Sequence, residues 1–376
     1  MKPKLEYINS QLKNIRKNNL YRKMYDSKIT GPYITINSKT LINLCSNDYL
    51  GITQPKISNK QNQSSSRLVA GNDNSFRILE EKLAKHKSQE RSLIFPTGYM
   101  ANLGVISSLV GKNDLILSDK LNHASLIEAC KLCNAKLTIF KHNNMSDLIH
   151  KIKTKARRKF IITEGIFSMD GDFSNLNTIS EISEKNNAII ILDDAHGDFV
   201  VGNDGKGTAN YFGVSKKIDV YISSLSKGLG SFGGYVSARK SIIELCINKS
   251  KSFIYTSALP RLLIDDATKR FESNREKNRK KLWKNVKKFS TGLKKIGFNV
   301  NSNSHIFPII IGKEKAAIEF GEYLFKNGIF AQPIRYPTVS RNNARIRISI
   351  TARLTDDHIT KSLSVLESAK RKFHLI

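Results

Sequence analysis

Residues 188–198 read AIIILDDAHGD, and this stretch indicates the class of fold. An apolar run leads directly into Asp193 and Asp194, as in a buried strand that ends in a polar loop. The same pattern recurs in SLIFPTGYM (92–100), DLILSDKLNHAS (114–125), KFIITEGIFSMDGD (159–172) and DVYISSLSKGLG (219–230). Apolar strands of this kind form mostly parallel sheets with helices on their faces. We therefore predict an α/β fold whose ligand site lies at the carboxyl ends of these strands.

The regions on either side predict further parts of the molecule. Leu5, Ile8, Leu12 and Ile15 recur at helical spacing, so the chain should begin with an amphipathic helix. A charged helical stretch at about 262–300 leads into short strand-like pieces, which predict a smaller C-terminal α+β domain. The expected parts are an N-terminal helix and arm at 1–44, a large ligand-binding domain at 45–262 and a small domain at 263–376.

The net charge is the most unusual bulk property of this chain. Its 376 residues include 62 lysines and arginines against 32 acidic residues, which gives a formal charge of +30. Such a charge can indicate a nucleic-acid partner. However, the basic residues are spread out, with modest concentrations at 151–159 and 275–288, and no aromatic residues interleave with them to stack on bases. We expect solvated helix faces and no nucleic-acid partner; binding to DNA or RNA with a steep salt dependence would favour the alternative.

The sequence also bears on location. No apolar run approaches the roughly 20 residues that span a bilayer, and residues 1–25 lack the apolar core of a secretory signal. We therefore expect a soluble, cytoplasmic protein with no membrane partner.

Four cysteines are present, at positions 45, 130, 133 and 246. They are too few and too scattered for a disulfide framework. Cys130 and Cys133 form a CxxC pair, but it lies in a helical pattern and no second pair of ligands accompanies it. We predict buried or half-buried helix cysteines rather than a redox or metal site.

The acidic residues after the 188–192 run need a positively charged partner. A carboxylate such as Asp193 at the end of a buried strand is costly to bury unless it meets a cation or a metal. A metal site could combine Asp193 and His196 with Asp194 or Asp198. Alternatively, Asp193 meets a protonated ring nitrogen of a cofactor, and His196 donates to an oxygen on the same ring.

Lys227 distinguishes the hypothesis of a metal site from that of a cofactor site. It follows an apolar run and is surrounded by glycines, which we expect to admit a planar ring, so it is suited to form a Schiff base. Ser224 and Ser226 can hydrogen-bond a phosphate, and Thr97-Gly98-Tyr99 marks a helix start whose free amides bind anions. A lysine, a carboxylate for a ring nitrogen and a phosphate cradle together indicate pyridoxal 5'-phosphate (PLP) and no metal.

Five motifs then carry a resemblance to a known family: NDYLG (47–51), LNHASLIEA (121–129), TEGIFSMDGD (163–172), DDAHG (193–197) and SLSKGLG (224–230). With FIYTSALP (253–260) and PIRYPTVSRNNARIRIS (333–349), the chain resembles the α-oxoamine synthases over nearly its whole length. The resemblance implies PLP-dependent transferases of fold type I. Such enzymes condense an amino acid with an acyl thioester and release carbon dioxide.

Within that family, the chain resembles one member most, through the segments TEGIFSMDGD, YTSALP and PTV, the last of which contains Thr338. The resemblance implies L-alanine and a pimeloyl thioester, carried on coenzyme A (CoA) or on a carrier protein, as substrates for biotin biosynthesis. The alternative is a sibling enzyme that joins glycine to acetyl-CoA.

The resemblance also assigns roles to single residues. Lys227 matches the Schiff-base lysine, and Asp193 matches the partner of the pyridinium nitrogen. His196 matches the residue that hydrogen-bonds the phenolic oxygen, and His123 the histidine that stacks on the ring and faces the substrate. Further cofactor contacts are implied at Gly98, Tyr99, Ser168 and Ser224, and substrate contacts at Arg22, Asn47, Thr338 and Arg347. Thr256 and Ser257 match a segment that reaches the neighbouring subunit's phosphate, which implies a homodimer with shared sites.

The chain departs from the family pattern in two places. Between NDYLG and SRLVAGND the family has a helix and a glycine-rich loop, whereas here the text is only ITQPKISNKQNQSS. Ser64, Ser65 and Ser66 replace glycines, and serine resists positive φ. Arg261 stands where a second proline would follow Pro260. We therefore expect the loop near the site entrance to have a different geometry.

Overall fold

A computed structural model describes residues 6–22, 24–53, 55, 65–300 and 302–374. The chain forms two compact units. The sheet unit comprises residues 47–168 and 172–281, and the small unit comprises residues 1–46, 169–171 and 282–376. These units divide the chain differently from the domains expected above, because the N-terminal arm groups with the C-terminal residues and residues 263–281 group with the sheet.

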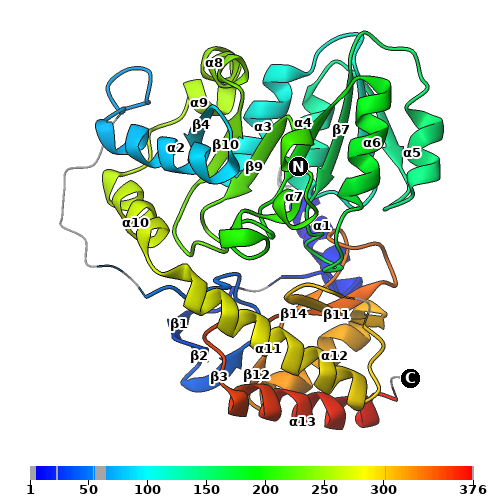
Figure 1. Ribbon diagram of the computed structural model, residues 1–376. Helices are drawn as coiled ribbons and strands as arrows, with labels where there is room; N and C mark the ends of the chain where they lie inside the picture. Colours follow the sequence, from blue (N-terminus) through cyan, green and yellow to red (C-terminus); the bar gives the residue numbers. More distant parts are fainter. Residues whose placement is uncertain (1–5, 23, 54, 56–64, 301, 375–376) are drawn as a thin grey trace. The chain divides into compact units, whose positions relative to one another are not determined.

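Seven strands form the central sheet of the sheet unit, in the order β4-β10-β9-β8-β7-β5-β6 (Figure 1). All pairings are parallel except those of β10 with β4 and with β9. The five apolar runs of the sequence are β4, β5, β7, β8 and β9, which confirms the predicted mostly parallel sheet. The bounds are β4 Arg91–Phe95, β5 Leu115–Asp119, β6 Lys136–Phe140, β7 Lys159–Glu164, β8 Ala188–Asp193, β9 Val220–Ser224 and β10 Gly234–Ala238.

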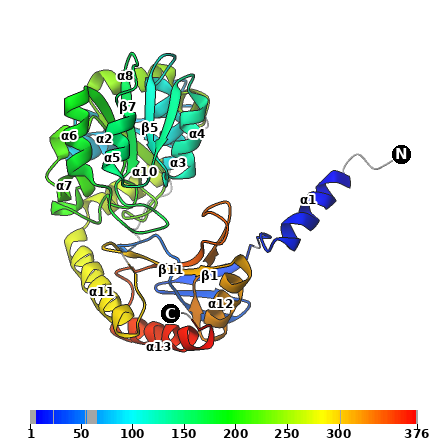
Figure 2. The ribbon, with the colours of Figure 1, turned by 90° about the vertical axis from the view of Figure 1, so that its right-hand side faces the viewer.

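Both faces of this sheet are covered, because alternate residues of each strand enter different cores. Ile191 packs in the core beneath α3 and α4, whereas Ile190 and Leu192 pack in the core beneath α5 and α6. Figure 2 shows these two helix pairs on opposite sides of the strands. The helices of the unit are α2 Asn74–Lys87, α3 Gly98–Leu109, α4 Ala124–Leu132, α5 Met145–Lys151, α6 Leu176–Asn186, α7 Thr208–Tyr211, α8 Lys240–Lys249, α9 Lys251–Ile254 and α10 Arg261–Glu272.

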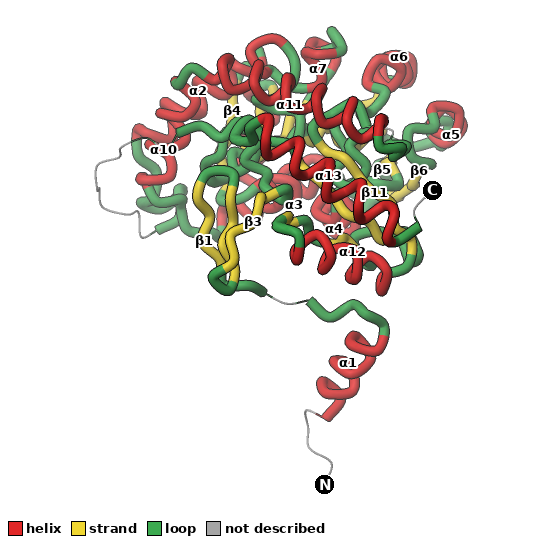
Figure 3. The backbone as a smooth tube through the Cα atoms, turned by 90° about the horizontal axis from the view of Figure 1, so that it is seen from below, coloured by secondary structure: helices red, strands yellow, loops and turns green. Residues whose placement is uncertain are grey.

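The small unit contains two short sheets and several helices. One sheet has the order β1-β2-β3-β12 and the other β11-β14-β13; α12 lies beside β11, and α13 lies beside α12 (Figure 3). The predicted N-terminal helix is α1. The bounds are α1 Glu6–Lys17, β1 Ser27–Thr30, β2 Tyr33–Ile36, β3 Lys39–Asn43, β11 Ile306–Gly312, α12 Glu314–Lys326, β12 Ile329–Phe330, β13 Pro333–Ile334, β14 Ala344–Ser349 and α13 Asp356–Lys372.

The charged stretch at 262–300 is two helices rather than one. Helix α10 ends at Glu272, the next residue Ser273 has an extended backbone, and α11 then runs over Arg275–Lys295. Along α11, Leu282, Val286 and Phe289 are buried while most of its lysines are exposed. This basic concentration is therefore a solvated helix face, as predicted.

The two cysteines of the CxxC pair lie at the end of a helix. Cys130 is buried in α4 and Cys133 caps its end, and both are free thiols. Burial raises the pKa of Cys130 to about 12 and that of Cys133 to about 11, so both stay protonated at neutral pH.

Among the described residues, none of the helices combines the length and apolarity needed to cross a bilayer.

Candidate active site

The carboxyl ends of β7, β8 and β9 bring several predicted site residues to one edge of the sheet. Glu164, the last residue of β7, lies beside Asp193, the last residue of β8. Asp193 in turn is in register with Ile222 of β9, two residues before Ser224. Parallel strands place their carboxyl ends together, so segments far apart in the sequence meet here.

Asp193 is held by two hydrogen bonds in this buried position. Its Oδ2 accepts from Asn102 Nδ2 at 2.7 Å, and its Oδ1 accepts from the amide of Ala195 at 3.0 Å. Asn102 also donates to Ser125 Oγ, which lies 2.7 Å from His123 Nδ1. Neutral donors thus fix the orientation of the carboxylate without neutralising its charge, which leaves it suited to a cationic ring nitrogen.

The environment of Asp194 and Asp198 does not favour the hypothesis of a metal site. Asp194 and Asp198 both pair with the buried Lys87. Within the described ranges, no group of three His, Cys, Asp or Glu side chains is placed to hold a metal ion.

His123 lies at the N-cap of α4, where its Nδ1 also accepts from the amide of Ser125 at 3.2 Å. Partial burial lowers the pKa of His123; Asp193 acts in the opposite direction, and Lys227 lowers it further. An imidazole with a lowered pKa is neutral at pH 7, which suits stacking on an aromatic ring.

His196 is buried, and its Nδ1 lies 2.7 Å from the hydroxyl of Tyr49. That hydroxyl donates to Asn47 Oδ1 at 3.0 Å, so it accepts from Nδ1–H of His196. The NDYLG motif therefore orients the histidine of the DDAHG motif. In the sequence, Tyr49 stands out only as part of the NDYLG motif. No local signal linked it to His196, which lies 147 positions away.

Lys227 is half-buried in the turn that follows β9. Besides the predicted clearance for a ring, two of the glycines around it are required by the turn itself. A Cβ on Gly228 would lie 2.5 Å from the carbonyl oxygen of Asp198, and Gly230 has a φ of +70°. These glycines allow the turn to pack tightly against neighbouring loops.

The segments predicted to form a phosphate cradle are the start of α3 and the end of β9. Thr97 caps α3 by accepting from Met100 N at 3.1 Å, and the first helical amides, at Gly98 and Tyr99, have no partner within a helix. A Cβ on Gly98 would lie 3.3 Å from Ser224 Cβ, so these two segments are in close approach. Ser224 Oγ lies 2.8 Å from Ser226 Oγ. Amides and hydroxyls converge here as an anion site requires.

Glu164 was missed as a site residue, although it stands in the quoted TEGIFSMDGD motif. It is buried, and the backbone amides of His123 and Ser168 hydrogen-bond to it. Burial, and then the neighbouring charge of Asp193, raise the pKa of Glu164 well above its usual range, while Lys227 lowers it. The carboxyl group therefore links two loops that carry predicted site residues.

The remaining substrate residues lie in the small unit. Arg347 is buried on β14 and donates to Ser349 Oγ at 3.1 Å. Thr338 is exposed, and Arg22 lines a cavity of about 970 Å³ together with Arg335. Burial, and then the charge of Arg22, lower the pKa of Arg335. This cavity therefore has a cationic wall suited to an anionic group.

The predicted inter-subunit segment belongs to the sheet unit. Ser257 is exposed, Thr256 is half-buried, and the next amide, of Ala258, donates to the carbonyl of Ser65 at 2.9 Å. Ser65 and Ser66 thus belong to a turn anchored to this segment, whereas Ser64 lies outside the described residues. Arg261 forms an ion pair with Asp73 at 3.2 Å.

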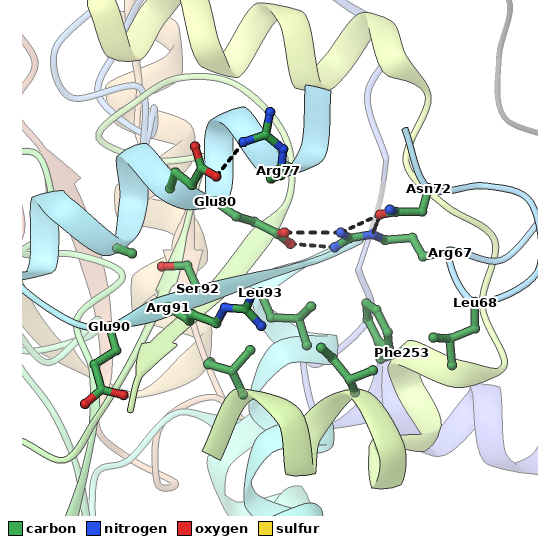
Figure 4. Close-up of a pocket in the computed structure, with 14 residues that line it drawn as sticks. Arg67, Leu68, Asn72, Arg77, Glu80, Glu90, Arg91, Ser92, Leu93 and Phe253 are labelled. Atoms are coloured by element: carbon green, nitrogen blue, oxygen red, sulfur yellow. Dashed lines mark hydrogen bonds and ion pairs between the residues drawn. The ribbon is translucent and has the colours of Figure 1, made fainter. Parts of the chain in front are cut away.

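A second cavity, of about 520 Å³, lies elsewhere in the sheet unit and is shown in Figure 4. Its lining comes from α2, β4, α8 and the segment around Arg67 rather than from the strand ends that carry Asp193 and Ser224. Arg67 contacts Glu80 and Asn72 there. We therefore do not assign this cavity to the cofactor.

His142 joins two carboxylates close to the LNHAS loop. Its Nδ1 lies 2.9 Å from Asp119 and its Nε2 lies 2.8 Å from Asp172. Asp119 also accepts from the amide of Leu121, two residues before His123. Although burial alone would lower the pKa of His142, hydrogen bonds to the two carboxylates raise it to about 10.

We expect His142→Gln to destabilise the protein by about 1–2 kcal/mol near neutral pH. The folded-state pKa of His142 lies above its ordinary value of 6.5, so its stabilisation is complete below pH 6.5 and is lost as the pH rises through about 10. Urea midpoints of both proteins measured across this range should therefore converge at high pH. A gap that does not change with pH would contradict the ion-pair assignment.

Comparison with known proteins agrees with this architecture. Residues 39–366 match the model of the family "Aminotransferase class I and II". The chain therefore belongs to this family. An 8-amino-7-oxononanoate synthase of Thermoanaerobacter pseudethanolicus is 38% identical, over 99% of this chain and 98% of the relative. Within the family, the chain belongs with the 8-amino-7-oxononanoate synthases, which confirms the resemblance stated from the sequence.

Solved structures give the same result for the fold. A serine palmitoyltransferase from S. paucimobilis, with bound PLP-myriocin, superposes with a TM-score of 0.92 at 24% identity, over 99% of both chains. An 8-amino-7-oxononanoate synthase from Francisella tularensis has a TM-score of 0.74 at 29% identity, over 89% of this chain and 99% of that one. The predicted fold type I is thereby confirmed.

Proposed function

We propose that the chain is a PLP-dependent synthase that condenses L-alanine with a pimeloyl thioester to give 8-amino-7-oxononanoate for biotin biosynthesis in the cytoplasm. The observation that carries this proposal is the strand-end cluster, in which a buried carboxylate, a lysine and an amide-lined anion site belong to one compact unit. Membership among the 8-amino-7-oxononanoate synthases supports the choice of substrates.

The residues present fit PLP. Gly98 lies so close to Ser224 that a side chain would crowd the proposed phosphate site, and the Asp193 carboxylate is oriented by two neutral hydrogen-bond donors. When bound, PLP would supply an electron-accepting ring for the carbon that loses its proton.

The chain's own residues then have distinct tasks. Asp193 would hold a proton at the ring nitrogen, and His196, oriented by Tyr49, would hydrogen-bond to the ring oxygen. The Nζ of Lys227 would anchor the cofactor and then move the Cα proton of the amino acid. Gly98, Tyr99, Ser168 and Ser224 would hold the cofactor, and the neutral ring of His123 would stack upon it.

For the substrates, we propose that Arg347 binds the carboxylate of the amino acid through its fork of donors. Asn47, Thr338 and Arg22 would contact the acyl substrate and its leaving group. Thr256 and Ser257 would serve the phosphate of a second copy, so that the working form is a homodimer.

Purified protein supplied with PLP should release carbon dioxide fastest from alanine with pimeloyl-CoA. We expect a rate at least about tenfold above that for glycine with acetyl-CoA, because the acyl pocket must accept a longer chain. Measuring carbon dioxide with alanine, glycine and serine against both thioesters tests this. A preference for glycine with acetyl-CoA would instead support the sibling activity.

A further inference from the structure

A buried cluster of charges lies directly behind the DDAHG motif, outside the residues assigned above. It contains Lys87 at the end of α2, with Asp194 and Asp198 at the two ends of the turn that carries His196. The exposed fractions of these three side chains are 1%, 0% and 0%, so no solvent screens them. Buried charges of this kind are stable only when each has its partners.

Lys87 is completely satisfied in this position. Its Nζ donates to Asp194 Oδ2 at 3.1 Å and to the carbonyl of Lys206 at 3.0 Å, and it lies 2.7 Å from Asp198 Oδ1. Three acceptors match the three donors of an ammonium group. Although burial alone would lower the pKa of Lys87, the charges of Asp198 and Asp194 raise it above its ordinary value. The lysine is therefore a fixed cation.

The two carboxylates tie the turn to different elements. Asp194 accepts from the hydroxyl of Thr208 at 2.7 Å. Asp198 accepts from Ser223 at 2.8 Å and from Tyr235, which stand next to Ser224 and Gly234. The turn between them is thereby connected to β9, whose last residue is Ser224, and to β10.

There is no room for the turn to shift within this cluster. A Cβ on Gly207 would lie 1.8 Å from Asp194 Oδ2 and 2.7 Å from Lys87 Nζ, and one on Gly197 would lie 2.3 Å from Asp194 Oδ1. Backbone therefore packs directly on the carboxylates. Removing the cation would leave two buried carboxyl groups close together without a counter-charge. Burial already raises the pKa of Asp194 to about 6, so their repulsion would be relieved by protonation of Asp194 or by movement of the turn, and either change alters how the turn is held.

We propose that Lys87 is a positioning residue, whose ammonium group holds the 194–198 turn so that Asp193 and His196 are presented correctly to the cofactor. This inference rests on the proposed PLP-dependent function. Lys87 acts through Asp194 and Asp198, and it has no role in the chemistry itself.

The test is a double-mutant cycle with Lys87→Met and Asp194→Asn, in which PLP is titrated into each full-length protein and followed by its visible absorbance. We expect Lys87→Met to weaken PLP binding at least about 30-fold and Asp194→Asn about 3–10-fold, because only the first leaves two buried carboxyl groups without the cation between them. The double variant should bind about as well as Asp194→Asn alone. Lys85→Met, an exposed change on the same helix, should bind like the wild type.

Additive losses in the double variant would overturn the proposal, because they would mean that Lys87 contributes packing rather than charge. Unchanged PLP binding by folded Lys87→Met would do the same. Should Lys87→Met not fold, recovery of folding in the double variant supports the charge coupling, and failure of both beside a folded Asp194→Asn refutes it. The same double-mutant cycle can be measured from the melting temperatures of the four proteins without PLP. Coupling between Lys87 and Asp194 in that cycle does not depend on PLP, so a failure of the proposed PLP function is distinguished from a failure of this inference.

Discussion

Lys227→Ala is expected to abolish turnover, with a loss of at least about 10³-fold, and to remove the visible absorbance typical of lysine-bound PLP. The lysine supplies both the covalent anchor and the base that moves the Cα proton, and alanine supplies neither. Lys227 is half-buried in the turn after β9, so the change should leave the fold intact. Visible spectra and carbon dioxide release measure the two effects separately.

The controls are Lys153→Ala and Lys155→Ala, which change exposed lysines in the basic 151–159 segment. Both variants should keep the spectrum and the rate of the wild type. A spectrum that survives Lys227→Ala, or is lost in a control, would show that a different lysine binds the cofactor.

Asp193→Asn should reduce turnover by about 10²–10³-fold while the protein stays folded. Asparagine keeps an oxygen that can accept from the Ala195 amide, but it lacks the negative charge that favours a protonated ring nitrogen. PLP should therefore still bind, with an altered spectrum. Rates and spectra recorded together establish whether the effect is on the chemistry or on binding.

Asp219→Asn is the matched control for Asp193→Asn. Asp219 precedes β9 at the opposite edge of the sheet and accepts from the amide of Ile190 at 2.8 Å, a bond that asparagine can also make. The activity of the Asp219→Asn variant should stay within about threefold of the wild type, because substitutions away from the active site that keep their hydrogen bonds usually have small effects. Equal losses in both variants would indicate that general destabilisation, not the charge at Asp193, limits turnover.

The predicted sheet follows from local properties of the chain. Each apolar run that was interpreted as a strand is a strand, and the two cores on its faces explain why these runs do not alternate with polar residues. Strands β6 and β10 were not predicted. Strand β6 is an edge strand in which Lys136 and Ile139 are exposed and only Phe140 is buried, and the short β10 begins at a glycine, so neither shows a long apolar run.

By itself, the sequence determined the class of fold and the order of the strand-end motifs, because an apolar strand and its following loop are neighbours along the chain. It also singled out Asp193, His196 and Lys227 through their residue types and spacing. Only the tertiary structure decided what holds them. Asn102 reaches Asp193 across 91 positions and Tyr49 reaches His196 across 147, while Lys87 meets Asp194 across 107. Such partners are selected by strand register and burial, which arise only when distant segments pack together.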